Sequence, residues 1–127
     1  MKKIAVLAFV MVLFSGVVFA QSAYDKDTVV AVMRANGGLI GQIGSAAGKN
    51  DFQGAAEKLM LMAQGMNKLL PMTPPKGDKA EWDKTVRQFV DAAYKGIGAC
   101  GTRDSAALNA AVNELRALNK AGHAAFK

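Results

Sequence analysis

The chain has 127 residues, a net charge of +6, seven methionines, one histidine and one cysteine. This is the length of one domain, and a single cysteine cannot form an internal disulfide, so the fold must rest on side-chain packing. Basic side chains are scattered among acidic ones and form no stripe with interleaved aromatic residues, which argues against nucleic acid as a partner. The mild positive charge suits either a solvated surface or an acidic partner protein.

Residues 1–20 have the pattern of a secretory signal peptide, with Lys2 and Lys3 before an apolar run and Ala20 ending a cleavage site. Without Lys2 and Lys3, 14 of the 16 basic side chains remain against 10 acidic ones. No later segment approaches the roughly 18 uninterrupted apolar residues of a transmembrane helix. We therefore expect a periplasmic domain, residues 21–127, without membrane attachment once the signal is removed.

The first predicted helix spans about residues 26–47, and Asp25 or Asp27 favours its N-terminal end. Apolar residues recur at helical spacing and define its expected inward face, which consists of Val29 or Val30, Met33, Gly37, Ile40, Ile43 and Ala47. Each glycine inside a helix costs up to about 1 kcal/mol relative to alanine. We expect the glycines here, Gly37 among them, to allow close packing of another helix or of a flat ligand.

A short break separates this helix from a second one at about residues 51–70. Gly48 suits the left-handed position after the first helix, and Asn50 suits the N-cap of the second. The crossover that follows holds three prolines and Gly77, which stop the helix and stiffen the connection.

Two further helices are predicted at about residues 79–99 and 105–125. Asp78 suits the N-cap of the earlier one, whose end Gly96 and the glycines after it should fray. Asp104 or Thr102 caps the later one. Four amphipathic helices with short connections predict an all-α fold, an antiparallel up-down-up-down four-helix bundle.

Cys100 has two interpretations at the end of the third predicted helix. It pairs with Cys100 of a second copy in a homodimer, or it stays a free thiol packed as a small hydrophobic side chain. We favour the free thiol, because the small neighbours Ala99 and Gly101 let a buried cysteine pack readily.

Met33 and His123 are the candidate metal ligands. In an antiparallel bundle the first helix begins beside the end of the fourth. Met33 lies about two turns into the first helix and His123 about one turn from the end of the fourth, so both should lie at one end at similar height. A thioether and an imidazole on facing helices form a ligand pair for haem iron. The alternatives are core packing for Met33 and a half-exposed side chain near the helix C-terminus for His123.

The end of the chain, His123-Ala124-Ala125-Phe126-Lys127, resembles the haem-attachment segment of the cytochrome c-prime family, in which C-x-x-C-H precedes an aromatic and a basic residue. Val32-Met33-Arg34-Ala35-Asn36-Gly37 is similar to the first-helix motif of the low-spin members, where methionine is the second axial ligand. The resemblance covers nearly all of residues 25–127. It implies a four-helix bundle with Met33 and His123 on haem iron, electron transfer and a redox partner protein.

The chain departs from that family at Asn119 and Gly122, which stand where the two attachment cysteines would be. Covalent attachment by this motif is thus excluded, and Cys100 lies on the order of 30 Å along the helix from His123. What the resemblance then implies is non-covalent haem, as in b-type four-helix cytochromes. Gly122 leaves room for it beside the histidine.

Four further residues are candidate haem contacts. Arg34 could pair with a propionate, Gly37 could let a flat ligand approach, and Trp82 and Phe126 could line the macrocycle. Core packing and solvent exposure explain each of them without haem as well. A haem-free relative with a binding or structural role is therefore the alternative function. An enzyme is not expected, because the chain has one histidine and no paired carboxylates on a helix face.

Overall fold

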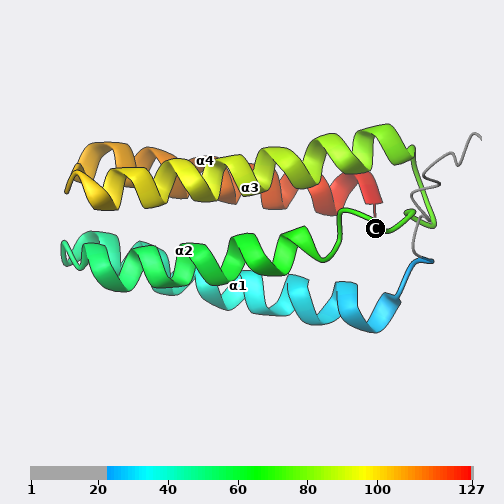
Figure 1. The fold of residues 1–127 in the computed structure, drawn as a ribbon, viewed down its shortest axis with the longest axis horizontal. Helices are drawn as coiled ribbons and strands as arrows, with labels where there is room; N and C mark the ends of the chain where they lie inside the picture. The colour runs from blue at the N-terminus through cyan, green and yellow to red at the C-terminus, as the bar shows by residue number, and fades with distance from the viewer. Residues whose placement is uncertain (1–22, 127) are drawn as a thin grey trace, which may run out of the picture.

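The computed structural model describes residues 23–126, and this part of the chain is built from helices without strands. The helices are α1 (Lys26–Gly48), α2 (Phe52–Asn67), α3 (Lys79–Gly101) and α4 (Ser105–Phe126). Each packs against its neighbours in the chain, and α1 packs against α4, which closes the bundle (Figure 1). The predicted antiparallel up-down-up-down four-helix bundle is confirmed. The predicted signal peptide lies outside the described residues.

An aspartate side chain caps the start of each helix. Its carboxylate accepts hydrogen bonds from backbone N–H groups of the first turn, and the four caps are Asp25, Asp51, Asp78 and Asp104. The expectation that Asn50 caps α2 is wrong. Asn50 takes the left-handed conformation instead, with φ of 54°, while Gly48 stays within α1. Asparagine tolerates the left-handed region because its short side chain can hydrogen-bond locally.

The inward face of α1 differs from the predicted one. The buried residues are Val29, Val32, Asn36, Ile40, Ile43, Ala46 and Ala47. Gly37 is exposed, and a Cβ atom there would meet nothing within 4 Å, so the prediction that Gly37 allows close packing is wrong. The apolar pattern placed Gly37 on the inward face, whereas the buried residue at this level of α1 is its neighbour Asn36. Asn36 is polar, so a pattern of apolar residues does not detect it.

Gly96 is a contact point between three helices and not a site of fraying, since α3 continues to Gly101. A Cβ atom at Gly96 would lie 2.8 Å from Leu59 Cδ1 of α2 and 3.4 Å from Ala111 Cβ of α4. The missing side chain lets α3 approach both neighbours closely. The three helices are therefore tightly packed around Gly96.

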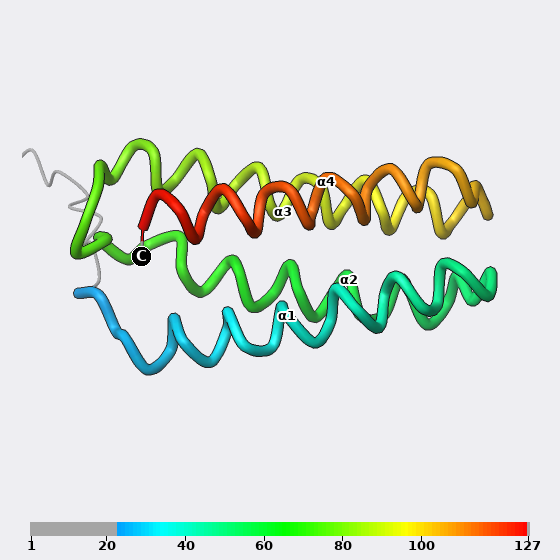
Figure 2. The backbone as a smooth tube through the Cα atoms, turned by 180° about the vertical axis from the view of Figure 1, so that it is seen from behind, coloured from blue at the N-terminus to red at the C-terminus, as the bar shows by residue number. Residues whose placement is uncertain are grey.

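One end of the bundle gathers the start of α1, the end of α4 and the crossover between α2 and α3 (Figure 2). The methionine and the histidine singled out above both lie in the helix portions that meet there. The fold thus brings together segments from opposite ends of the described chain.

Candidate functional site

A cavity of about 490 Å³ lies at this end of the bundle, within the size range of small-molecule and cofactor sites. All four helices contribute to its wall, which is mostly apolar and contains no Asp or Glu side chain. The lining residues are Tyr24, Val29, Val30, Met33, Arg34, Met66, Leu69, Trp82, Thr85, Val86, Phe89, Leu118, Asn119, Gly122, His123 and Phe126.

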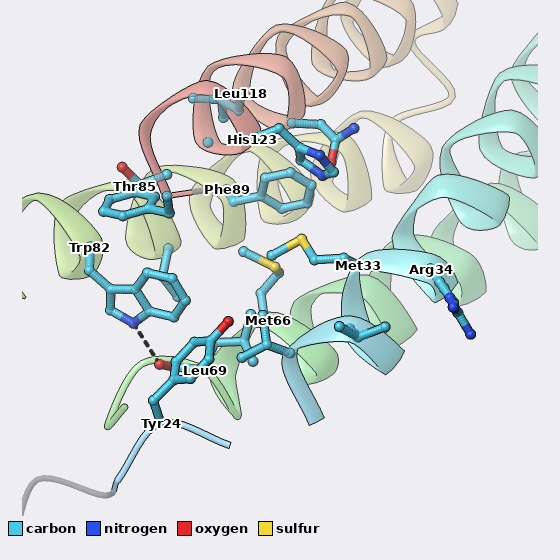
Figure 3. Close-up of a pocket in the computed structure, with 16 residues that line it drawn as sticks. Tyr24, Met33, Arg34, Met66, Leu69, Trp82, Thr85, Phe89, Leu118 and His123 are labelled. Carbon is cyan, nitrogen blue, oxygen red and sulfur yellow. Dashed lines mark hydrogen bonds between the residues drawn. The ribbon is translucent and has the colours of Figure 1, made fainter. Parts of the chain in front are cut away.

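Met33 of α1 and His123 of α4 lie on the wall of this one cavity. The Met33 side chain is half-buried, and His123 is exposed, so the histidine belongs to the rim. Figure 3 shows the Met33 sulfur pointing into the cavity, which Phe89 and His123 also line. A ligand between Met33 and His123 would pack against Phe89, which is buried.

Trp82 and Phe126 form the closed aromatic side of the cavity. Their rings meet edge to face with centroids 5.2 Å apart, and Tyr24 stands edge to face on Trp82 at 6.4 Å. The Trp82 indole N–H donates to the Leu69 carbonyl over 2.8 Å (Figure 3), which satisfies its polar group within the protein. Trp82 therefore offers the cavity an apolar surface. Tyr24 was not predicted, because it precedes α1 and belongs to no helical pattern.

Phe126 is seated over the crossover between α2 and α3. Gly77 of this crossover has φ of 91°, and a Cβ atom there would lie 3.1 Å from Phe126 Cε1. Glycine is needed at this position both for its left-handed backbone and for the close approach of the ring. The turn thus packs against the end of α4 at Phe126, which lines the cavity.

Two of the candidate haem contacts, Arg34 and Gly37, do not face the interior of the cavity. Arg34 borders the cavity, but its guanidinium is exposed and directed away from the interior (Figure 3). Gly37 is not among the lining residues, so the expected approach of a ligand to that glycine has no counterpart in the cavity. The remaining candidates all line the cavity, and they are Met33, Trp82, Gly122, His123 and Phe126.

Asn119 and Gly122 also line the cavity, one turn apart on α4 beside His123. A Cβ atom at Gly122 would lie 3.6 Å from Thr85 Cγ2, an ordinary van der Waals contact. Residues 119 and 122, which stand where the cytochrome c-prime family has cysteines, therefore face the same space as the histidine, and a Cβ atom fits at residue 122.

The hydrogen bond between Asn36 and Met66 was not predicted from the sequence. Asn36 is 1% exposed, and its Nδ2 donates to the Met66 sulfur over 3.1 Å. Met66 lines the cavity, and Figure 3 shows it pointing toward Met33. The burial of Asn36 could have been predicted from its spacing relative to Val32, Ile40 and Ile43, which places Asn36 on the apolar stripe of α1.

Comparison of the chain with protein-family models, curated proteins and solved structures finds no match. Across residues 23–126, no three His, Cys, Asp or Glu side chains gather into a group able to hold a metal ion. No helix in the same range has the length and apolar character needed to cross a membrane. The resemblance to the cytochrome c-prime family stays a prediction from the residues quoted above.

Proposed function

We propose that this domain is a periplasmic, cytochrome-like electron-transfer protein that holds haem non-covalently, with Met33 and His123 as the iron ligands. One observation carries the proposal. A thioether on α1 and an imidazole on α4 line a single cofactor-sized cavity. Haem, when bound, supplies a one-electron iron couple whose reduction potential is raised by Met/His ligation.

The chemistry of the wall supports this choice of ligand. A porphyrin is a flat apolar ring with polar edges, and the cavity offers aromatic and aliphatic surfaces inside and polar groups at its rim. Trp82 and Phe89 are buried parts of the wall, whereas Asn119 is half-buried and Arg34 is exposed. Arg34 can serve a propionate only by swinging back toward the cavity mouth, since it points away in Figure 3.

The exposed position of His123 would also favour electron transfer to a partner protein. An iron ligand at the rim leaves one edge of the haem near solvent, where electrons pass to another protein. Lys120, one turn before His123 on α4, and Arg34 are exposed basic residues near this rim. An acidic redox partner protein would be attracted to them, and the encounter would weaken as salt is added.

Titration of the purified metal-free protein with haemin tests the proposal. We expect a sharp low-spin absorption spectrum that saturates at one haem per chain and is lost in His123→Ala. Met60→Leu is the matched control, because Met60 is exposed on α2 and is not a lining residue of the cavity. A spectrum without low-spin features, or one that His123→Ala leaves unchanged, would rule the proposal out.

A haem-free protein with a binding or structural role is the second candidate. Asn119 and Gly122 favour it, because both face the cavity at the positions where covalent attachment would need cysteines. This candidate predicts a colourless, stably folded helical protein whose melting temperature does not respond to haemin. The same titration, followed by circular dichroism during heating, separates the two candidates.

A further inference from the structure

The cavity wall holds two sulfur atoms. Met33 comes from α1 and Met66 from α2, and Figure 3 shows the two side chains pointing toward one another with their sulfurs adjacent in that view. Met66 is 3% exposed, so its sulfur is screened from water. His123 stands on the α4 side of the same cavity. Three helices therefore present two thioethers and one imidazole to one space.

The Met66 sulfur is held in place by a buried amide. Asn36 is the one buried polar residue of the core described here, and its Nδ2 donates to the Met66 sulfur over 3.1 Å. A buried amide is costly unless it is hydrogen-bonded, so Asn36 and Met66 constrain one another. A thioether sulfur has two lone pairs, and one of them remains for a ligand. Outer-shell hydrogen bonds of this kind orient metal ligands.

The donor set selects a soft ion. Thioether ligands favour Cu(I), and imidazole also suits copper. Magnesium and calcium prefer carboxylate and carbonyl oxygens, and the cavity wall has no carboxylate. Structural zinc sites use four thiolate or imidazole ligands, of which His123 is the single example here. The buried Phe89 and Trp82 rings form apolar parts of the wall, which disfavour a more highly charged ion.

We propose that Met33, Met66 and His123 form a binding site for a single Cu(I) ion, with Asn36 as the positioning residue that orients the Met66 sulfur. The site does not depend on haem binding. Because Met33 and His123 are shared, Cu(I) and haem exclude one another from the cavity. Met66 distinguishes the two ligands, since it belongs to the copper site alone.

The test is an anaerobic titration of the metal-free protein with Cu(I) in the presence of a competing copper chelator. We expect a single ion per chain, and a loss of affinity of about tenfold or more in Met33→Leu, Met66→Leu and His123→Ala. Asn36→Leu should weaken binding by about 10–100-fold, as other outer-shell changes do. Met60→Leu, an exposed methionine on the same helix as Met66, should bind like the wild type.

Folding of each variant is checked by thermal unfolding. Met66→Leu leaves the Asn36 amide without its acceptor, so the double variant Asn36→Leu/Met66→Leu, which replaces both partners by apolar side chains, keeps the test valid if the single variant unfolds. Failure to compete with the chelator would overturn the proposal. So would wild-type affinity in the Met66 variants, or an equal loss in Met60→Leu.

The outcome for copper can be told apart from the outcome for haem. Met66→Leu is expected to lose Cu(I) but to retain the low-spin haemin spectrum. Copper binding without any haemin spectrum would reject the proposed function and keep the copper site. A low-spin haemin spectrum without copper binding would reject the copper site and keep the proposed function.

Discussion

Introducing cysteines at residues 119 and 122 changes the candidate site directly. In Asn119→Cys/Gly122→Cys the end of α4 acquires the C-x-x-C-H motif. The new Cβ at residue 122 would lie 3.6 Å from Thr85 Cγ2, so it fits without displacing a neighbour. Replacing glycine within a helix recovers a few tenths of a kcal/mol, and Asn and Cys have similar helix propensities. We expect the unfolding free energy to change by less than about 0.5 kcal/mol, or less than about 4 °C in melting temperature.

The assay is expression together with a haem-attachment system, followed by a haem stain of the denatured protein and an absorption spectrum of the folded one. The variant should carry haem that survives denaturation, because both thiols directly precede the histidine. In the folded protein this haem should be low-spin, and Met33→Leu in the same background should convert it to high-spin. Met60→Leu in that background should leave it low-spin.

Covalent attachment alone would not show that Met33 and His123 share one iron, because attachment requires only the C-x-x-C-H motif in the chain. The decisive result is the ligation state after folding. A folded variant whose attached haem is indifferent to Met33→Leu would refute the reasoning that α1 and α4 present their ligands to a common iron.

Three further predictions concern the bundle. Gly96→Ala should destabilise the protein by up to about 2 kcal/mol in chemical denaturation, since overpacking costs about 1–3 kcal/mol and the better helix propensity of alanine returns about 1 kcal/mol; a stabilisation of about 1 kcal/mol, which helix propensity alone would give, would contradict the close contact with Leu59. Burial raises the pKa of the Cys100 thiol, so a thiol reagent should label it slowly at neutral pH until the protein is unfolded, whereas rapid labelling would place it at the surface. The hydrogen bond from the Thr28 hydroxyl lowers the pKa of Asp25 below its ordinary value of 3.8, so the stability advantage of the wild type over Asp25→Ala should be complete above that pH and disappear as pH falls through the lowered pKa; a difference that persists in stronger acid would show that the charge is not its source.

The arrangement of helices could be predicted from the sequence because apolar periodicity and turn chemistry act locally. Asp78 was identified as a cap, Asp104 was one of two candidates for the cap of the last helix, and the prolines and Gly77 marked the long crossover. The meeting of Met33 and His123 at one cavity also followed from antiparallel topology and helix lengths, which are properties of the backbone. Their role as ligands stays a prediction.

The parts that could not be predicted depend on contacts between helices. Asn36 is polar yet buried, because its amide finds the Met66 sulfur on another helix, and a periodicity analysis of one helix cannot detect such a partner. Gly96 looked like a helix end because glycine weakens a helix, whereas its role is to admit Leu59 and Ala111. Gly37 was assigned a packing role because close packing would explain a costly glycine inside a helix, but Gly37 faces solvent.

The proposed function requires that Met33 and His123 bind one iron porphyrin that has no thioether bonds to the protein. The most direct measurement is the electron paramagnetic resonance spectrum of the haemin-loaded wild-type protein beside those of Met33→Leu and His123→Ala. We expect a single low-spin ferric signal for the wild type and high-spin signals for both variants. A high-spin wild-type spectrum, or a low-spin signal that survives both substitutions, would contradict it.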